Sequence, residues 1–153
     1  MRGKTYCVYK YVWEDGYYYI GRTSTNNIQY RRYGNDKQYS SQYVYKKMCS
    51  SPYKKKICFE SDNIFKVYWL EHKCIRENWN LINCLNGSTE EKWINTAIKD
   101  CESQDLKTLA SMMIECENWI EGEGKDLVNK ILNYNWENIE ESLNSDYVER
   151  KLF

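Results

Sequence analysis

A tyrosine phenol can orient a phosphate or pass on the proton of an attacking water, and this chain places Tyr9 and Tyr19 in a predicted β-hairpin. Residues 5–13 and 17–22 are rich in β-branched and aromatic residues, which favour strands. Residues 14–16 between them read Glu-Asp-Gly, the composition of a three-residue turn whose glycine takes a positive φ. The sequence therefore predicts two antiparallel strands that carry both phenols.

The length of this turn decides which residues face one another. With a three-residue loop, Tyr9 pairs with Gly21 and Tyr11 pairs with Tyr19, so these four residues share one face of the sheet. Because glycine has no side chain, we expect open space beside the Tyr9 phenol, enough for a phosphate group. The alternative is a tyrosine-rich face that only packs its rings.

A carboxylate is expected at a buried position of a helix. Ser61-Asp62-Asn63 supplies N-cap chemistry for a helix that runs to about Asn78, and Glu71 falls in line with its apolar stripe. A lone buried carboxylate is costly unless it is paired or binds a metal. Glu71 is thus either a metal ligand or the salt-bridge partner of a Lys or Arg. His72, the single histidine, points about 100° away on the helix and is expected at the surface.

The elements around these residues predict an α+β fold. Short helices are expected over residues 26–33 and 41–48, and a third strand is expected over residues 54–60. Ser88-Thr89-Glu90-Glu91 resembles a capping box, and helical periodicity follows it with breaks at Gly122 and Gly124. We expect a small three-stranded antiparallel sheet flanked by helices, with a helical C-terminal extension.

Charge divides the chain into two parts. Residues 1–87 contain 15 Lys or Arg and 7 Asp or Glu, whereas residues 88–153 contain 7 and 15. A basic segment with interleaved aromatic residues is typical of a domain that binds nucleic acid. The acidic segment has several candidate roles: to form a homodimer through residues 88–153, to recruit a partner, to cover the basic surface, or to cap the sheet.

The remaining composition narrows the class of protein. Seven cysteines, none in a Cys-x-x-Cys pair, indicate neither a disulfide framework nor a zinc ribbon. No apolar run is long enough to cross a membrane, and no secretory signal precedes the first strand. The expectation is a reduced, soluble, intracellular protein, in the cytoplasm or nucleus of a host cell. Abundant Asn, Lys, Tyr and Ile suggest an AT-rich genome such as that of a phage or large virus.

Several motifs, taken in order, resemble one family. Cys7-Val8-Tyr9 followed by Tyr19-Ile20-Gly21 resembles the paired signature of the GIY-YIG nucleases, with Cys7 and Val8 in place of Gly and Ile. Asn27-Ile28-Gln29-Tyr30-Arg31 is similar to the family's helix with a catalytic Arg, and Arg32 is a close rival to Arg31. Leu70-Glu71 with Ile75 resembles the helix whose Glu binds the metal. Leu81-Ile82-Asn83 resembles the segment whose Asn braces the site, with Asn86 as the alternative.

The resemblance implies a DNA endonuclease that uses one Mg²⁺ or Mn²⁺ ion, bound by Glu71, and leaves 5′-phosphate and 3′-hydroxyl ends. Arg31 would neutralise charge on the phosphate, Tyr9 would pass on the proton of the water, and Tyr19 would orient the water or the phosphate. The other expected substrate-binding residues are Gly21, Arg22, Arg32, Lys37 and Asn83. Two alternatives stay open: a nucleic-acid-binding module without catalysis, and a protein-interaction adaptor that uses the acidic helices.

Overall fold

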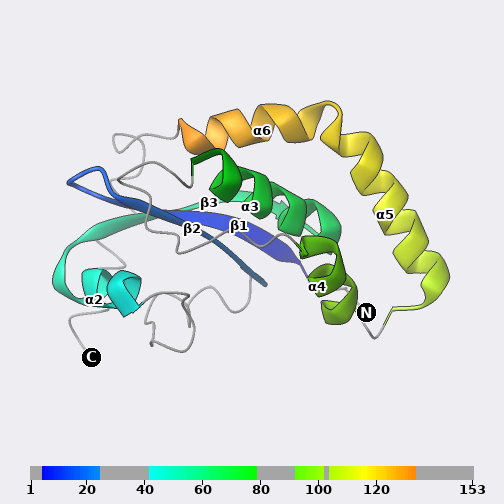
Figure 1. Cartoon of the computed structure of the whole chain (residues 1–153), viewed down its shortest axis with the longest axis horizontal. Coiled ribbons are helices and arrows are strands. Elements are labelled where there is room, and N and C mark those ends of the chain that lie inside the picture. The colour runs from blue at the N-terminus through cyan, green and yellow to red at the C-terminus, as the bar shows by residue number, and fades with distance from the viewer. Residues whose placement is uncertain (1–4, 25–41, 79–91, 102–103, 134–153) are drawn as a thin grey trace.

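The computed structural model describes residues 5–24, 42–78, 92–101 and 104–133. Within these ranges the chain forms an α+β fold, in which a three-stranded antiparallel sheet is combined with five helices (Figure 1). This part of the expected architecture is confirmed. The helix expected over residues 26–33 lies outside the described residues.

The sheet contains β1 (Tyr6–Trp13), β2 (Tyr18–Ser24) and β3 (Tyr53–Ser61), in the order β2-β1-β3. β1 is therefore the central strand, antiparallel to both neighbours. Between β1 and β3 the register shifts after Val8, where Tyr9 faces Ile57 and Val8 faces Phe59. This bulge places Cys58 as an extra residue in β3.

The hairpin between β1 and β2 has the predicted turn. Gly16 has a φ of 88°, the left-handed region that glycine adopts without strain. The backbone N–H of Trp13 donates to the carbonyl of Tyr17 at 2.9 Å, and that of Gly16 donates to the carbonyl of Trp13 at 2.9 Å. This closure confirms the predicted pairs, Tyr9 with Gly21 and Tyr11 with Tyr19.

The two faces of the sheet are covered by different helices. One face, here the tyrosine face, packs against α2 (Gln42–Ser50) through Val44 and Met48. The opposite face, here the α3 face, packs against α3 (Ile64–Asn78). Figure 1 shows α2 and α3 on opposite sides of the sheet. The tyrosine face consists of Cys7, Tyr9, Tyr11, Trp13, Tyr19 and Tyr53, and the α3 face includes Val8, Val12, Tyr18 and Ile20.

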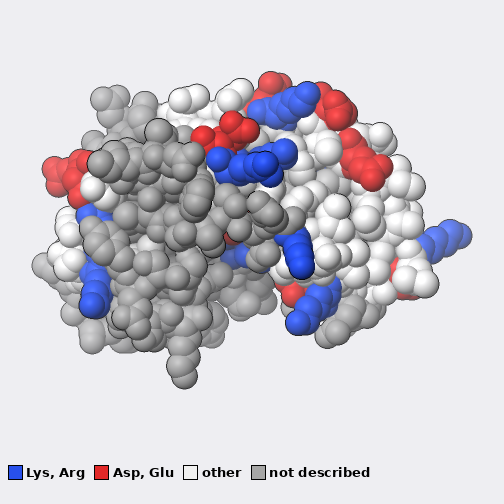
Figure 2. Space-filling view, in the orientation of Figure 1, with Lys and Arg blue, Asp and Glu red and all other residues white. Residues whose placement is uncertain are grey.

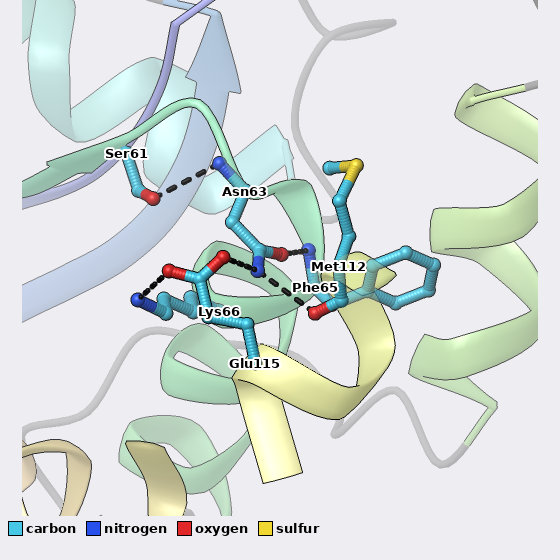
Figure 3. Close-up of polar contacts among 6 residues, drawn as sticks. All are labelled: Ser61, Asn63, Phe65, Lys66, Met112 and Glu115. Atoms are coloured by element: carbon cyan, nitrogen blue, oxygen red, sulfur yellow. Dashed lines mark hydrogen bonds and ion pairs between the residues drawn. The ribbon is translucent and has the colours of Figure 1, made fainter. Parts of the chain in front are cut away.

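Asn63 starts α3 as the sequence predicts, and it also holds a later helix (Figure 3). Its Oδ1 accepts a hydrogen bond from the N–H of Phe65 at 3.0 Å, which satisfies one of the free donors of the first turn. Its Nδ2 donates to the carbonyl of Met112 at 2.8 Å and to Glu115 Oε2 at 3.3 Å. Lys66 Nζ donates to Glu115 Oε1 at 2.9 Å. The N-terminus of α3 is therefore joined to α5.

The acidic segment contributes α4 (Trp93–Asp100), α5 (Leu106–Ile120) and α6 (Glu123–Leu132), which pack on the outer side of α3. α5 and α6 form an arch over α3 (Figure 1). Helices of both halves of the chain thus share one apolar core with the α3 face of the sheet. The expected capping box over residues 88–91 lies outside the described residues, and α4 begins after Lys92, which makes no side-chain cap.

His72 on α3 does not lie at the surface, where the sequence predicted it. This side chain is buried, not exposed. A helix that packs on a sheet with one side and on other helices with the opposite side has little surface left for solvent. The prediction failed because it assumed that only one face of α3 is covered.

The break between α5 and α6 depends on one glycine, not two. Gly122 is the N-cap residue of α6, as expected of a helix breaker. Gly124 lies inside α6 instead, where a Cβ would come within 3.0 Å of the Trp119 ring and 3.1 Å of the Trp69 ring. Its role is to let α6 approach these indoles.

No helix in the described part of the chain is long and apolar enough to cross a membrane. The cysteines of the described ranges, Cys7, Cys49, Cys58, Cys74, Cys101 and Cys116, are all free thiols.

Candidate functional site

The two signature tyrosines lie together on the tyrosine face. The ring centroids of Tyr9 and Tyr11 are 4.9 Å apart, and those of Tyr9 and Tyr19 are 6.4 Å apart. All three side chains are buried. Neighbouring rings at these distances contribute favourable aromatic contacts beyond their burial. The site residues Tyr9, Tyr19 and Gly21 are therefore close to one another, as the hairpin register requires.

The space expected beside the Tyr9 phenol is not open. A Cβ on Gly21 would overlap with Tyr9 Oη and would lie 2.5 Å from Tyr9 Cζ. The phenol thus lies directly over Gly21 and fills the volume that the missing side chain provides. The prediction was wrong on this point, because pairing identifies the neighbour of Gly21 but not the direction in which the ring lies.

Glu71 occupies the buried position that the helical stripe predicts, and it is paired. Arg22 Nη1 lies 3.5 Å from Glu71 Oε2, and the Arg22 and Glu71 side chains are 22% and 9% exposed. Arg22 pairs with Val8 across β1 and β2, so its side chain leaves the sheet on the α3 face. The ion pair joins strand β2 to helix α3 and compensates the buried carboxylate.

Tyr68 and Asp100 extend this pair into a polar cluster, here the Arg22 cluster: Arg22, Tyr68, Glu71 and Asp100. Arg22 Cζ lies 3.9 Å from the centroid of the Tyr68 ring, and the Tyr68 hydroxyl donates a hydrogen bond to Asp100 Oδ2. A guanidinium stacked on an aromatic face is held in one orientation. Three elements, β2, α3 and α4, contribute to the cluster.

The electrostatics of the Arg22 cluster keep its guanidinium charged and its phenol neutral. Burial would lower the pKa of Arg22, but the charge of Glu71, the Tyr68 phenol and Asp100 outweigh it and raise that pKa. Burial raises the pKa of Tyr68, and the hydrogen bond to Asp100 raises it further, against the opposing charge of Arg22. Tyr68 therefore serves here as a hydrogen-bond donor rather than as a base.

The predicted site residues fall into two groups that lie on opposite sides of the sheet. Tyr9, Tyr19 and Gly21 belong to the tyrosine face, whereas Arg22 and Glu71 meet on the α3 face. The described residues therefore do not form a single pocket from these five. Arg31, Arg32, Lys37, Asn83 and the alternative Asn86 lie outside the described residues.

Two members of the Arg22 cluster were not identified from the sequence. Tyr68 precedes Glu71 by three residues and so lies on the same side of α3, a spacing that was interpreted only as core. Asp100 comes from α4, 29 residues after Glu71, and no periodicity relates the two helices. Tyr68 could have been found from its spacing, but Asp100 could not.

The donors around Glu71 suit a divalent ion that takes few protein ligands. In the described part of the chain no group of three His, Cys, Asp or Glu side chains converges to hold a metal. A single carboxylate such as Glu71 nevertheless suits Mg²⁺, which keeps several waters and takes one or two protein carboxylates together with substrate phosphates. The hard oxygen donors of Glu71 fit Mg²⁺ or Mn²⁺ and would suit softer metals less.

The described residues therefore define an α+β protein with a buried carboxylate–guanidinium pair between an edge strand and a central helix. Comparison of the chain with protein-family models, with curated proteins and with solved structures found no match.

Proposed function

We propose that this protein is a metal-dependent endonuclease that hydrolyses DNA phosphodiester bonds, with Glu71 as the metal ligand and Arg22 as a phosphate-binding residue. The observation that carries the proposal is the Arg22–Glu71 pair, because it combines a buried carboxylate with a guanidinium on the residue that follows the Tyr-Ile-Gly motif. The ordered resemblance of residues 5–87 to the GIY-YIG nucleases supports the same function.

The geometry of the pair favours an exchange of partners. Its separation of 3.5 Å exceeds the roughly 2.7–2.9 Å of a strong charge-assisted hydrogen bond. A divalent ion would offer Glu71 a closer partner, and a DNA phosphate would offer Arg22 two acceptor oxygens that match its planar fork. In this proposal the two residues neutralise each other until metal and DNA replace the contact between them.

The chemistry divides between the ion and the protein. When bound, the metal supplies Lewis-acid stabilisation of charge on the phosphate and the leaving oxygen. Arg22, oriented by its stacking on Tyr68, adds positive charge at the phosphate. The proton-handling role of Tyr9, the orienting role of Tyr19 and the catalytic role of Arg31 stay predictions from the resemblance.

One observation favours a second candidate, a nucleic-acid-binding module without catalysis. The signature phenols Tyr9 and Tyr19 lie on one side of the sheet, and Glu71 of helix α3, the proposed metal ligand, lies on the opposite side. A chain that kept the fold and its phosphate-binding arginines but lost the converging site would have this arrangement. The two candidates predict the same DNA binding and differ in turnover.

The test is cleavage of labelled duplex and branched DNA by the full chain, with Mg²⁺ and with a chelator. We expect cleavage only with Mg²⁺, and a fall of roughly a hundredfold or more in Glu71→Gln, because the substitution removes the metal ligand but keeps the shape of the side chain. DNA affinity should be unchanged or higher. The matched control is Glu115→Gln, whose carboxylate pairs with Lys66 on another surface, and it should cleave at the wild-type rate.

Two results would contradict the proposal. Cleavage by Glu71→Gln at the wild-type rate would remove the metal assignment. DNA binding by the wild type without any metal-dependent cleavage would favour the binding module.

A further inference from the structure

The outer helices of the molecule contain an apolar groove that the proposed nuclease site does not use. Its volume is about 260 Å³, and it lies between α3, α4 and α5. Its apolar wall includes Trp69, Trp93, Met113 and Ile120, and its charged residues are Lys73 on α3 and Glu117 on α5. A cavity of roughly 150 Å³ already accepts a benzene ring, so this groove can receive side chains of another molecule.

Large apolar side chains are exposed on the two helices, α4 and α5, that form walls of the groove, and one of them, Ile94, lines it. Leu106 is 84% exposed, Ile114 is 59% exposed and Ile94 is 39% exposed. Together with Ile98, they are all the exposed large hydrophobic residues in the described part of the chain, and all four belong to α4 and α5. Single exposed apolar residues are ordinary, but a cluster beside an apolar groove marks an interaction surface.

The position of these residues on α5 separates them from the core. Leu109, Cys116 and Trp119 are buried and face the rest of the protein. Leu106, Met113 and Glu117 recur at spacings of seven and four residues, so they form a second stripe on the same helix. Figure 2 shows a largely uncharged area over the part of the molecule where Figure 1 places α5, with charged side chains near α4 and acidic residues along the outer side of α5.

We propose that this surface, here the α4–α5 surface, binds a second copy of the same chain to form a symmetric dimer. The argument is charge complementarity. Lys73 and Glu117 have opposite charges and stand on different helices that line the groove. A two-fold axis along the groove brings Lys73 of one copy opposite Glu117 of the other, and the same contact forms twice. Leu106 and Ile114 protrude from the same helix and extend the apolar contact between the copies beyond the groove.

A nucleic acid is a poor occupant of this surface. Glu115, Glu117 and Glu121 on or next to α5 would repel phosphates, and Lys73 is the single cation among the residues that line the groove. The dimer does not depend on the proposed nuclease activity. It selects one of the roles open to the acidic segment and assigns residues to it.

The first test measures the mass of the full chain by sedimentation equilibrium over a range of concentrations. The wild type should reach the mass of a dimer, and Leu106→Glu should raise the dissociation constant at least about tenfold. Ser111→Glu adds the same charge to an exposed position of α5, roughly 140° round the helix from Leu106, and should associate like the wild type. Leu106 is 84% exposed, so thermal melts of this variant should match those of the wild type.

The second test asks whether the charge contact crosses between copies. Lys73→Glu and Glu117→Lys should each weaken self-association, because each places two like charges opposite each other. An equimolar mixture of the two variants should restore dimers, since each contact in the mixed pair joins opposite charges. A wild type that stays monomeric at about 100 μM, a Leu106→Glu variant that associates normally, or a mixture that stays monomeric would overturn the proposal. A monomeric wild type would leave the groove to a different partner.

Discussion

At the scale of single residues, the close contact of Tyr9 with Gly21 is the most constrained feature of the signature motifs. The Tyr9 ring is fully buried and lies against the Cα of Gly21, so neither residue can change without the other. This contact gives glycine at this position a packing reason that is independent of any catalytic role. A larger residue at position 21 would require the Tyr9 ring to move.

Gly21→Ala should lower the free energy of unfolding by about 1–3 kcal/mol, the usual cost of overpacking a buried position. Urea unfolding of the full chain measures it. Tyr9→Phe in the same chain should relieve only part of the loss, because Cζ and Cε1 of the ring stay 2.5 Å and 3.0 Å from the added methyl group.

Ser111→Ala, at an exposed position of α5, is the control and should change stability by at most about 0.5 kcal/mol. Equal effects of Gly21→Ala and Ser111→Ala would mean that the Tyr9 ring moves aside easily.

At the scale of elements, the junction between α3 and α5 should make stability depend on pH. Hydrogen bonds from Lys66 and Asn63 hold the pKa of Glu115 below its ordinary value. A carboxyl whose pKa is lowered by folding stabilises the native state above its unfolded pKa of roughly 4.3, and this contribution is lost as the pH falls through the folded pKa.

Glu115→Gln should therefore destabilise the protein at pH 7 by a few tenths to about 1 kcal/mol, the scale of an exposed ion pair, and the difference should vanish near pH 3. Urea unfolding of both proteins at the two pH values checks this. Adding Lys66→Met to each should reduce the pH dependence of the difference and leave the smaller part that comes from Asn63. A difference in unfolding free energy that is the same at both pH values would show that the charge of Glu115 does not contribute to stability.

Local signals in the sequence predicted the elements well, and long-range contacts account for what they missed. The turn at Gly16 predicted the register of the hairpin, and Ser61 and Asn63 predicted where α3 begins. Both predictions held because these residues act on backbone only a few positions away. Burial of Glu71 followed from its spacing, but its pairing with Arg22 required the docking of α3 on the sheet. His72 was misplaced because its burial depends on packing between elements, which the periodicity of a single helix does not report.

At the scale of the whole molecule, α3 is the element that the two halves of the chain share. One side of it covers the sheet, and α4, α5 and α6 pack on its outer side. Lys10, in the central strand, is buried and donates to the carbonyls of Ile131 and Leu132 at the end of α6 at 2.9 Å and 3.3 Å. The charge asymmetry of the sequence thus does not correspond to two separate cores.

The full chain should unfold in one cooperative transition, in which tryptophan fluorescence and far-UV circular dichroism coincide. A chain that ends after residue 87 would expose the outer side of α3, including Phe65 and Trp69, and should lack a cooperative melt. Two resolved transitions in the full chain, or a folded 1–87 fragment, would show that the sheet is stable without the acidic helices.

The strand order has a consequence for how this protein behaves at high concentration. Because β1 is central, β3 is an edge of the sheet within the described residues, and the edge of a sheet is a template on which other chains can add strands and aggregate. β3 contains Lys54, Lys55 and Lys56 in succession, so its neighbouring side chains on both faces are cationic. Lys54 is buried, Lys55 is half-buried and Lys56 is exposed, so a second copy that approached this edge would bring the Lys55 and Lys56 side chains of both copies together, which opposes fibre-like growth from the sheet.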